Sequence, residues 1–184
     1  KSLKSQGEKA SNYVFKQLDD ANKWIAARAV WLLPYIGSQG IDACIKMLED
    51  ENSDQRVVAY RSLRRAGHDM IPHARRMCKD KSPQVRREIA LSLRDLPAEK
   101  TKDIFIELAK RCDTTDKNSL EAIGLGAAKQ ESIIWKAIKN ELHPDSSVKW
   151  SDHFARLTWR LWGAASVNDL KARITNLLER TGFG

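Results

Sequence analysis

Apolar and polar positions alternate with a helical period along this chain, and the pattern recurs every thirty residues. Three sets of residues share that interval: Asp20, Asp50 and Asp80; Asn22, Asn52 and Ser82; and Leu33, Leu63 and Leu93. A weaker fourth copy places Asp113, Thr115 and Leu125 in the same roles. A fixed interval of this length is typical of proteins built from stacked structural repeats.

Each copy starts with residues that favour the beginning of a helix. In the third copy, Asp80 and Ser82 come just before Pro83. Asp and Ser side chains accept hydrogen bonds from the free backbone N–H groups at a helix start, and Pro suits the first turn because it lacks a donor. Apolar residues then follow at helical spacing, as at Val85 and Ile89. We therefore expect one helix to begin after each of these polar elements.

A second helical stripe lies between these helices, for example at Met70, Ala74 and Met77. The pattern thus predicts two helices per copy, with Gly and Pro residues falling between them. The predicted helices cover residues 8–18, 23–33, 39–49, 53–65, 69–79, 83–94, 98–112, 117–127, 130–142, 148–162 and 166–181. Alternating patterns typical of strands are absent from the sequence.

These helices predict an all-α fold of the α-α superhelix (α-solenoid) class, with about five to six helical pairs. One pair cannot bury its apolar face alone, so neighbouring pairs must stack on it. We expect a single domain over residues 1–184, with clear repeats over 20–127 and degenerate repeats with a C-terminal cap over 128–184. Because the chain starts at Lys1 without Met, we expect it to be a piece of a longer protein.

A six-residue spacing links Asp50 to Arg56 and Asp80 to Arg86. Helical projection places both arginines beside the apolar stripe, so we expect them to turn inward. This arrangement resembles HEAT repeats, of the armadillo type of fold, and that resemblance implies a structural ladder of Asp and Arg from successive repeats. The outer copies have Ala26 and Ser119 at the arginine position.

Three further stretches, residues 70–97, 107–127 and 150–162, carry a narrower resemblance. They are similar to the HEAT-repeat region of large multidomain bacterial membrane-bound dehydrogenases or c-type haem-binding proteins. That family implies an N-terminal propeller, a helical-repeat middle and a C-terminal cytochrome with CxxCH, outside the cytoplasm (periplasmic or membrane-attached). No CxxCH occurs in this chain. The resemblance therefore implies a connecting segment whose parent protein holds any oxidoreductase or haem chemistry elsewhere.

Composition agrees with a packed domain that does not enter a membrane. Of the 184 residues, 42% are hydrophobic and 30% are charged, a mix that excludes a disordered chain. No apolar run reaches the length of about eighteen residues that a membrane-spanning helix needs. The cysteines lack disulfide or CxxC spacing and fall on apolar helix faces, which favours buried free thiols over a redox or metal role. They are Cys44, Cys78 and Cys112.

The sequence contains no catalytic constellation. HExxH, GxSxG, Walker and complete GxGxxG motifs are absent, and the pair Gly124 and Gly126 favours close helix packing over phosphate binding. The four histidines have no spacing that places them together on one helix face, and we expect them at the surface or in loops. They are His68, His73, His143 and His153. We therefore predict that this segment is not an enzyme and binds no cofactor or metal.

Positive charge is concentrated in one part of the chain, which has a net charge of +8 overall. Residues 51–100 hold twelve Lys and Arg against seven Asp and Glu, so 12 − 7 gives +5. Helical projection places eight of them opposite the apolar stripes, where we expect solvent exposure: Arg61, Arg64, Arg65, Arg75, Arg76, Lys79, Arg87 and Arg94. This basic band suits phosphate, acidic protein surfaces or anionic lipid. An ordinary solvated face, or two groups on opposite surfaces, are the alternatives.

Trp159 projects to the side opposite the apolar stripe of its helix, which leaves two interpretations. Neighbouring helices over residues 133–142 and 166–178 could cover both sides of this helix. Alternatively, Trp159 beside Arg156 is an exposed anchor for another domain or protein, since Trp and Arg are enriched at binding hot spots.

The leading functional hypothesis is a non-catalytic scaffold that binds proteins or other domains of its own chain. The alternative is a nucleic-acid-binding protein similar to HEAT-like DNA glycosylases, which are basic helical solenoids. Those enzymes use aromatic residues around a lesion, whereas the tryptophans of this chain are expected away from the basic band. Attachment to a membrane surface is disfavoured because no bulky apolar face is expected beside Lys and Arg.

Overall fold

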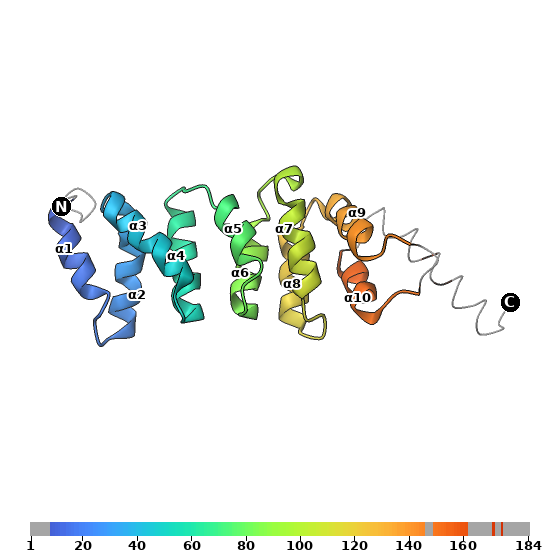
Figure 1. The fold of residues 1–184 in the computed structure, drawn as a ribbon, viewed down its shortest axis with the longest axis horizontal. Helices are drawn as coiled ribbons and strands as arrows, with labels where there is room; N and C mark the ends of the chain where they lie inside the picture. The colour runs from blue at the N-terminus through green and yellow to red at the C-terminus, as the bar shows by residue number, and fades with distance from the viewer. Residues whose placement is uncertain (1–7, 146–148, 162–170, 172–173, 175–184) are drawn as a thin grey trace. The chain divides into compact units, whose positions relative to one another are not determined.

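The computed structural model describes residues 8–145, 149–161, 171 and 174, and within them it contains helices and turns but no strand (Figure 1). The α-helices are α1 (Glu8–Gln17), α2 (Lys23–Leu32), α3 (Ser38–Lys46), α4 (Ser53–Arg65), α5 (Ile71–Met77), α6 (Pro83–Ser92), α7 (Ala98–Arg111), α8 (Lys117–Gly126), α9 (Glu131–Leu142) and α10 (Asp152–Arg160). Two 3₁₀ helices, η2 (Leu33–Tyr35) and η3 (Met47–Glu49), follow α2 and α3. The expected all-α fold is confirmed.

The predicted helix ends shift by a few residues. The stretches 23–33 and 39–49 each end in a 3₁₀ turn rather than in α-helix. The helix expected over 148–162 begins at Asp152, because the Ser151 hydroxyl accepts a hydrogen bond from the Phe154 N–H at 3.1 Å. The helix expected over 166–181 lies outside the described residues, apart from residues 171 and 174.

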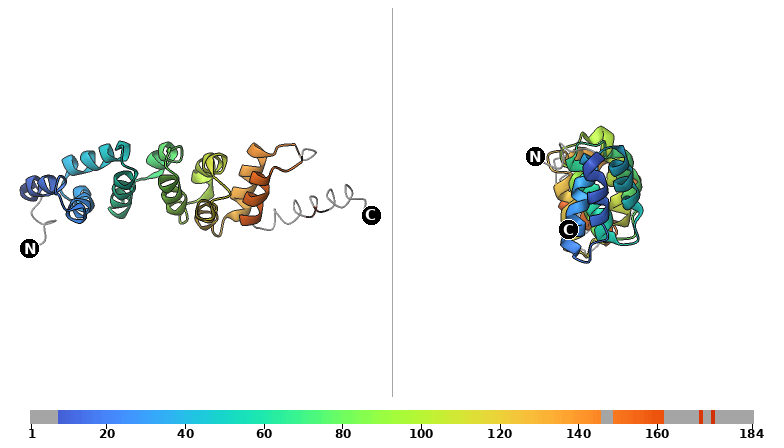
Figure 2. Two further views of the ribbon diagram at one scale, coloured as in Figure 1. Left: turned by 90° about the horizontal axis from the view of Figure 1, so that it is seen from below. Right: turned by 90° about the vertical axis from the view of Figure 1, so that its left-hand side faces the viewer.

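The chain divides into two compact units, residues 1–72 and residues 73–184. In unit 1, α2 packs beside α4, and α3 contacts α4. In unit 2, α6, α8 and α10 contact one another in sequence to form one layer, while α7 and α9 pack in a second layer (Figure 2). Large buried side chains such as Leu33 and Leu63 in unit 1, and Ile89 and Leu93 in unit 2, fill the space between the helices. The expected single domain stays a prediction.

The polar element at each repeat start forms the same local structure. In all four copies an Asp carboxylate accepts a hydrogen bond from the backbone N–H two residues later, at 2.8 to 2.9 Å. Asn22 and Asn52 then accept from the first-turn N–H groups of α2 and α4. The periodic Asp residues are thus explained by helix initiation.

The cap of the fourth copy lies one residue later than the repeat register predicts, at Asp116 rather than Thr115. Asp116 caps α8, because its carboxylate accepts from the Asn118 N–H at 3.0 Å. The position equivalent to Leu93 is therefore Ala127, which is fully buried, whereas Leu125 is 45% exposed. The assignment of Leu125 to the buried repeat position was wrong. The same shift moves the arginine position from Ser119 to Leu120.

Equivalent helices pack through the same repeat position. Ser62 donates to the Val30 carbonyl at 2.9 Å between α4 and α2. The corresponding residue of α8 is Gly126, where an added Cβ would overlap the Ala90 carbonyl of α6. The second glycine of this pair, Gly124, lies under the Arg160 guanidinium. Close packing, rather than phosphate binding, explains both glycines.

The two inward arginines bind backbone carbonyl groups. Arg56 is buried and donates through Nη1 to the Asp50 and Glu51 carbonyls at 2.7 and 3.0 Å. Arg86 is half-buried and donates through Nη1 to the carbonyls of Asp80 (2.6 Å) and Lys81 (3.0 Å). Each arginine therefore fixes the turn before its own helix. The Asp–Arg ladder between successive repeats stays a prediction.

Candidate interaction surface

The eight residues of the predicted basic band lie on three helices or just after them. Arg61, Arg64 and Arg65 belong to α4 in unit 1, while Arg75, Arg76 and Lys79 on or just after α5, with Arg87 and Arg94 on or just after α6, belong to unit 2. Seven are exposed, but Arg87 is half-buried because its Nη1 lies 3.1 Å from the Asp116 carboxylate of α8. The expectation of full exposure was wrong for this residue.

Acidic partners neutralise much of the band in unit 2. Arg75 Nε lies 2.7 Å from the Asp103 carboxylate, and Lys79 Nζ lies 4.0 Å from the Glu107 carboxylate. One helix further along, Lys110 of α7 lies 2.6 Å from the Glu141 carboxylate of α9. Oppositely charged residues therefore alternate across these helices. Three of the five band residues in unit 2, Arg75, Lys79 and Arg87, thus have an acidic partner.

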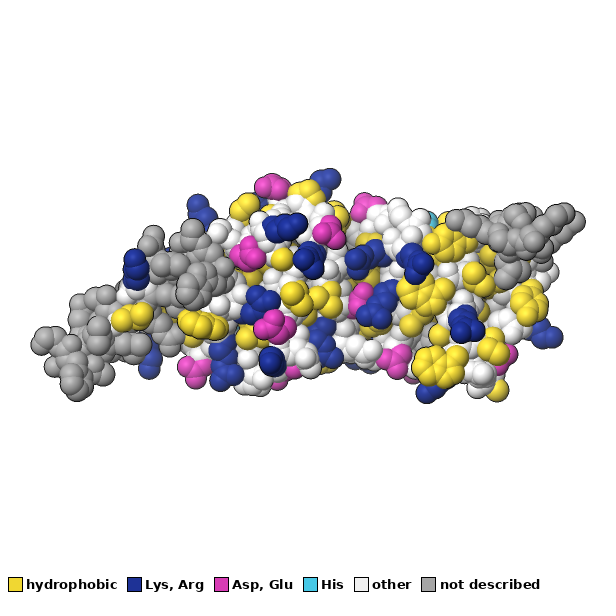
Figure 3. Space-filling view, turned by 180° about the vertical axis from the view of Figure 1, so that it is seen from behind, with side chains coloured by type: hydrophobic (Ala, Val, Ile, Leu, Met, Phe, Trp, Pro, Cys, Tyr) yellow, Lys and Arg dark blue, Asp and Glu magenta, His cyan; other side chains and the backbone are white. Residues whose placement is uncertain are grey.

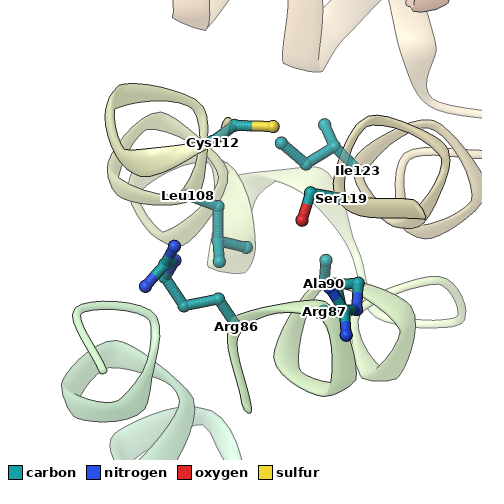
Figure 4. A pocket seen from close by; sticks show the side chains of 7 residues that line it. All are labelled: Arg86, Arg87, Ala90, Leu108, Cys112, Ser119 and Ile123. Atoms are coloured by element: carbon teal, nitrogen blue, oxygen red, sulfur yellow. The ribbon is translucent and has the colours of Figure 1, made fainter. Parts of the chain in front are cut away.

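These charged residues line an open groove of about 310 Å³. Its floor includes Cys78 and Ile104, and its rim carries the paired residues of α5, α7 and α9. A second, smaller pocket lies between α6, α7 and α8 (Figure 4). It is lined by Arg86, Arg87, Ala90, Leu108, Cys112, Ser119 and Ile123 and has room for about 10 Å³, or one water molecule. The two guanidinium groups diverge there, so the pocket offers no converging cationic site.

Helix α10 carries three further residues of interest, Arg156, Trp159 and Arg160. Arg160 extends from α10 to α8, where Nε and Nη2 lie 3.0 and 2.9 Å from the Glu121 carboxylate. Arg156 is exposed and donates to the Thr114 carbonyl at 3.4 Å. Trp159 is 64% exposed.

Trp159 occupies a defined repeat position, the eighth residue after the helix cap. The same position in the four earlier repeats is buried in each case: Val30, Tyr60, Ala90 and Gly124. In unit 2 the equivalent helix of the next repeat covers this position: Gly126 of α8 lies against Ala90 of α6. The helix over 166–178 that was expected to cover Trp159 lies outside the described residues, so both interpretations of this residue stay predictions.

Two histidines are less exposed than a surface position would make them: His143 lies in the loop after α9, as expected, but is buried, whereas His153 lies in α10. His143 is only 6% exposed and stacks on Phe154, with ring centroids 4.8 Å apart. His153 is half-buried, and its Nε2 lies 2.9 Å from the Ala109 carbonyl oxygen. Aromatic packing on Phe154 of α10 buries His143, whereas contact with α7 partly buries His153, and no local pattern predicts either contact. Among the described residues, no group of three or more His, Cys, Asp or Glu side chains is arranged to hold a metal ion.

An aromatic and cationic surface in unit 1 was missed by the sequence reasoning. We call it the Trp–Arg face; it comprises Trp24, Arg28 and Trp31 of α2 with Arg61 and Arg65 of α4. The Arg65 guanidinium lies 5.9 Å from the centroid of the Trp31 ring. The expectation that tryptophans lie away from the basic band was therefore wrong in this unit. The signal in the sequence was the spacing of Trp24, Arg28 and Trp31 by four and three residues, which places the three side chains on one side of α2.

The three cysteines are free and buried. Burial raises the pKa of each thiol from 9.0 to about 11. For Cys78 the nearby Glu107 carboxylate raises the pKa further. The thiols are therefore protonated near neutral pH and are weak nucleophiles.

We expect the protein to lose stability between pH values of about 9 and 11. In this interval the unfolded chain releases thiol protons that the folded chain retains, so the free energy of unfolding falls as pH rises. Urea midpoints measured at about pH 8 and about pH 10 test this. A variant with all three cysteines replaced by Ala should show a smaller fall. An equal fall in both chains would contradict the assignment.

The geometry defines the class of protein as an all-α helical-repeat protein of the α-α superhelix type. Residues 41–124, a little under half of the chain, match the family described as HEAT repeats. HEAT repeats are generally scaffold or protein-interaction modules. No curated protein and no solved structure matches the chain. No helix of the described residues is long and apolar enough to cross a membrane.

Proposed function

We propose that this chain is a non-catalytic HEAT-repeat scaffold that binds proteins or other domains of its own chain. The observation that carries the proposal is a pair of exposed leucines at the same repeat position of two neighbouring helices. Leu91 and Leu125 are the ninth residues after the caps of α6 and α8, and they are 39% and 45% exposed. Because α6 and α8 pack side by side, the two leucines lie on one surface. Exposed apolar side chains on a rigid helical surface are typical of protein interfaces.

The resemblance to multidomain dehydrogenases and haem-binding proteins suggests a narrower role. In this proposal the chain joins catalytic or cytochrome domains of a bacterial protein outside the cytoplasm. The three stretches over 70–97, 107–127 and 150–162 support it. Two of these stretches, 107–127 and 150–162, pack against each other, because Gly124 lies under the Arg160 guanidinium.

A photo-crosslinking amino acid placed at position 125 tests the scaffold function in cells of the source organism. We expect a covalent adduct with one protein or with another part of the same chain. The matched control is the same amino acid at Glu99, an exposed residue at the start of α7. Equal adducts from both positions, or adducts from neither, would overturn the proposal.

Nucleic-acid binding is the second candidate, and two residues of unit 1 favour it: the exposed Trp24 and the half-buried Trp31, which lies beside Arg65. Against it, Asp103, Glu107 and Asp116 pair with basic residues in unit 2. Anisotropy of labelled single- and double-stranded oligonucleotides at about 50 and 200 mM salt separates the candidates. The scaffold proposal predicts no salt-dependent binding. Micromolar binding that Arg61→Glu with Arg65→Glu abolishes would favour nucleic acid instead.

A further inference from the structure

The Trp–Arg face has a composition that is unusual for an outer surface. Trp24 is 69% exposed, whereas Trp135 in unit 2 is fully buried. Trp24, Arg28 and Trp31 are separated by four and three residues, so they lie along one side of α2. An indole in contact with water loses the stabilisation that its burial would give. Nothing in the packing of α2 requires Trp24, because its neighbours Ala26, Ala29 and Val30 form the buried side of this helix.

Arg65 of α4 continues this surface beside Trp31. Ser62 donates to the Val30 carbonyl at 2.9 Å and holds α4 against α2. The Arg65 guanidinium lies 5.9 Å from the Trp31 ring centroid, and Lys23 Nζ lies 5.4 Å from the Trp24 ring centroid. Cations at these distances are attracted to the face of an aromatic ring. In Figure 3 the right-hand part, which is unit 1, shows hydrophobic side chains with Lys and Arg side chains between them.

Acidic and basic residues lie at opposite ends of this surface. Ser62 and Arg65, near the C-terminal end of α4, contact Val30 and Trp31, near the C-terminal end of α2, so these ends of the two helices lie side by side. Acidic residues precede or begin these helices: Asp19, Asp20, Asp50, Glu51 and Asp54. Arg61, Arg64 and Arg65 lie at the opposite end of α4. A polyanion that followed the two tryptophans would run from the arginines onto this acidic edge, which disfavours a nucleic-acid backbone.

We propose that the Trp–Arg face binds an acidic segment of a partner protein that carries an apolar side chain beside its carboxylates. The two indoles contact the apolar side chain, and Arg28, Arg61 and Arg65 pair with the carboxylates. Trp and Arg are the residues most often found at the energetic centre of protein interfaces. The proposal rests on the scaffold function and names the class of partner and the surface.

Selection of displayed random peptides on the full chain tests this proposal. We expect the recovered peptides to be enriched in Asp and Glu next to Phe, Trp or Leu. Trp24→Ala, and Arg61→Glu combined with Arg65→Glu, should each weaken binding of a recovered peptide about tenfold or more. Circular dichroism should show that both variants fold, since the changed side chains are exposed or half-buried. Arg94→Glu, an exposed arginine after α6, is the matched control and should leave binding unchanged.

Several results would overturn the inference. Recovered peptides without acidic enrichment, or binding unaffected by both variants, would exclude this face as the site. If the same peptides lost affinity in Leu91→Ser or Leu125→Ser instead, the scaffold function would stand and only the Trp–Arg face would be excluded. If a thymidine oligonucleotide bound more tightly than the recovered peptides, and the arginine variant lost this binding, the result would contradict both the scaffold function and the acidic partner. A concentration-dependent dimer lost in Trp24→Ala would assign the face to a second copy of the chain.

Discussion

Replacing Gly126 by Ala is expected to destabilise unit 2 by about 2 kcal/mol, although Ala favours a helix over Gly by about 1 kcal/mol. The added Cβ would overlap the Ala90 carbonyl oxygen and would lie 3.3 Å from Cε1 of Phe105. A backbone carbonyl inside α6 cannot turn aside as a side chain can, so α6 and α8 must separate. Urea denaturation followed by circular dichroism measures the loss as a lower midpoint.

Gly124→Ala is the matched control, two residues earlier in the same helix. Here the added Cβ would meet the Arg160 guanidinium, the far end of a long side chain that can move away. The ion pair with Glu121 is partly exposed, so its loss costs at most about 1 kcal/mol, which the helix preference of Ala offsets. We expect stability within about 0.5 kcal/mol of the unaltered chain. Equal losses in both variants would show that contact with the Ala90 carbonyl is not the reason for Gly126.

The order of the helices could be predicted from the sequence, because each repeat starts with its own local signal. Asp20, Asp50 and Asp80 each bind the N–H two residues later, and this contact depends only on neighbouring residues. The fourth copy offers two candidates for the helix cap, Thr115 and Asp116, since both side chains can accept a hydrogen bond from a first-turn N–H. The choice of Asp116 as the cap agrees with tertiary packing, since it places Gly126 on α6 and Ala127 in the core. A pattern within one copy cannot contain that information.

The candidate surface was less predictable, because helical projection shows which residues face outward but not what lies beside them. Arg87 projects outward, yet it pairs with Asp116, which is 29 positions away in sequence. Trp31 and Arg65 are likewise brought together only by the packing of α2 on α4. The surface in unit 1 was missed for a related reason. Helix α2 is apolar on two sides, so its tryptophans are easily assigned to the core.

Replacing Trp135 by Ala is expected to have the largest effect, a loss of about 3–5 kcal/mol of stability in unit 2. The Trp135 ring is fully buried, with its centroid 4.9 Å from that of Phe154 and 6.5 Å from that of Trp150. Phe154 in turn stacks on His143, so one cluster joins α9, α10 and the segment between them. Removing the indole leaves a cavity at the centre of this cluster, and the rigid helices around it cannot close it.

Trp24→Ala is the matched control, since it removes the same side chain from an exposed position and should change stability by no more than about 0.5 kcal/mol. Chemical denaturation of both variants, followed by circular dichroism, gives the comparison. Trp135→Ala should also reduce the protection of backbone amides from hydrogen exchange more in α9 and α10 than in α6. Similar losses of stability from the two substitutions would contradict the assignment of Trp135 as the centre of the α9–α10 core. A loss spread evenly over α6 to α10 would instead mean that unit 2 unfolds as one cooperative block, with its repeats coupled more tightly than their separate contacts imply.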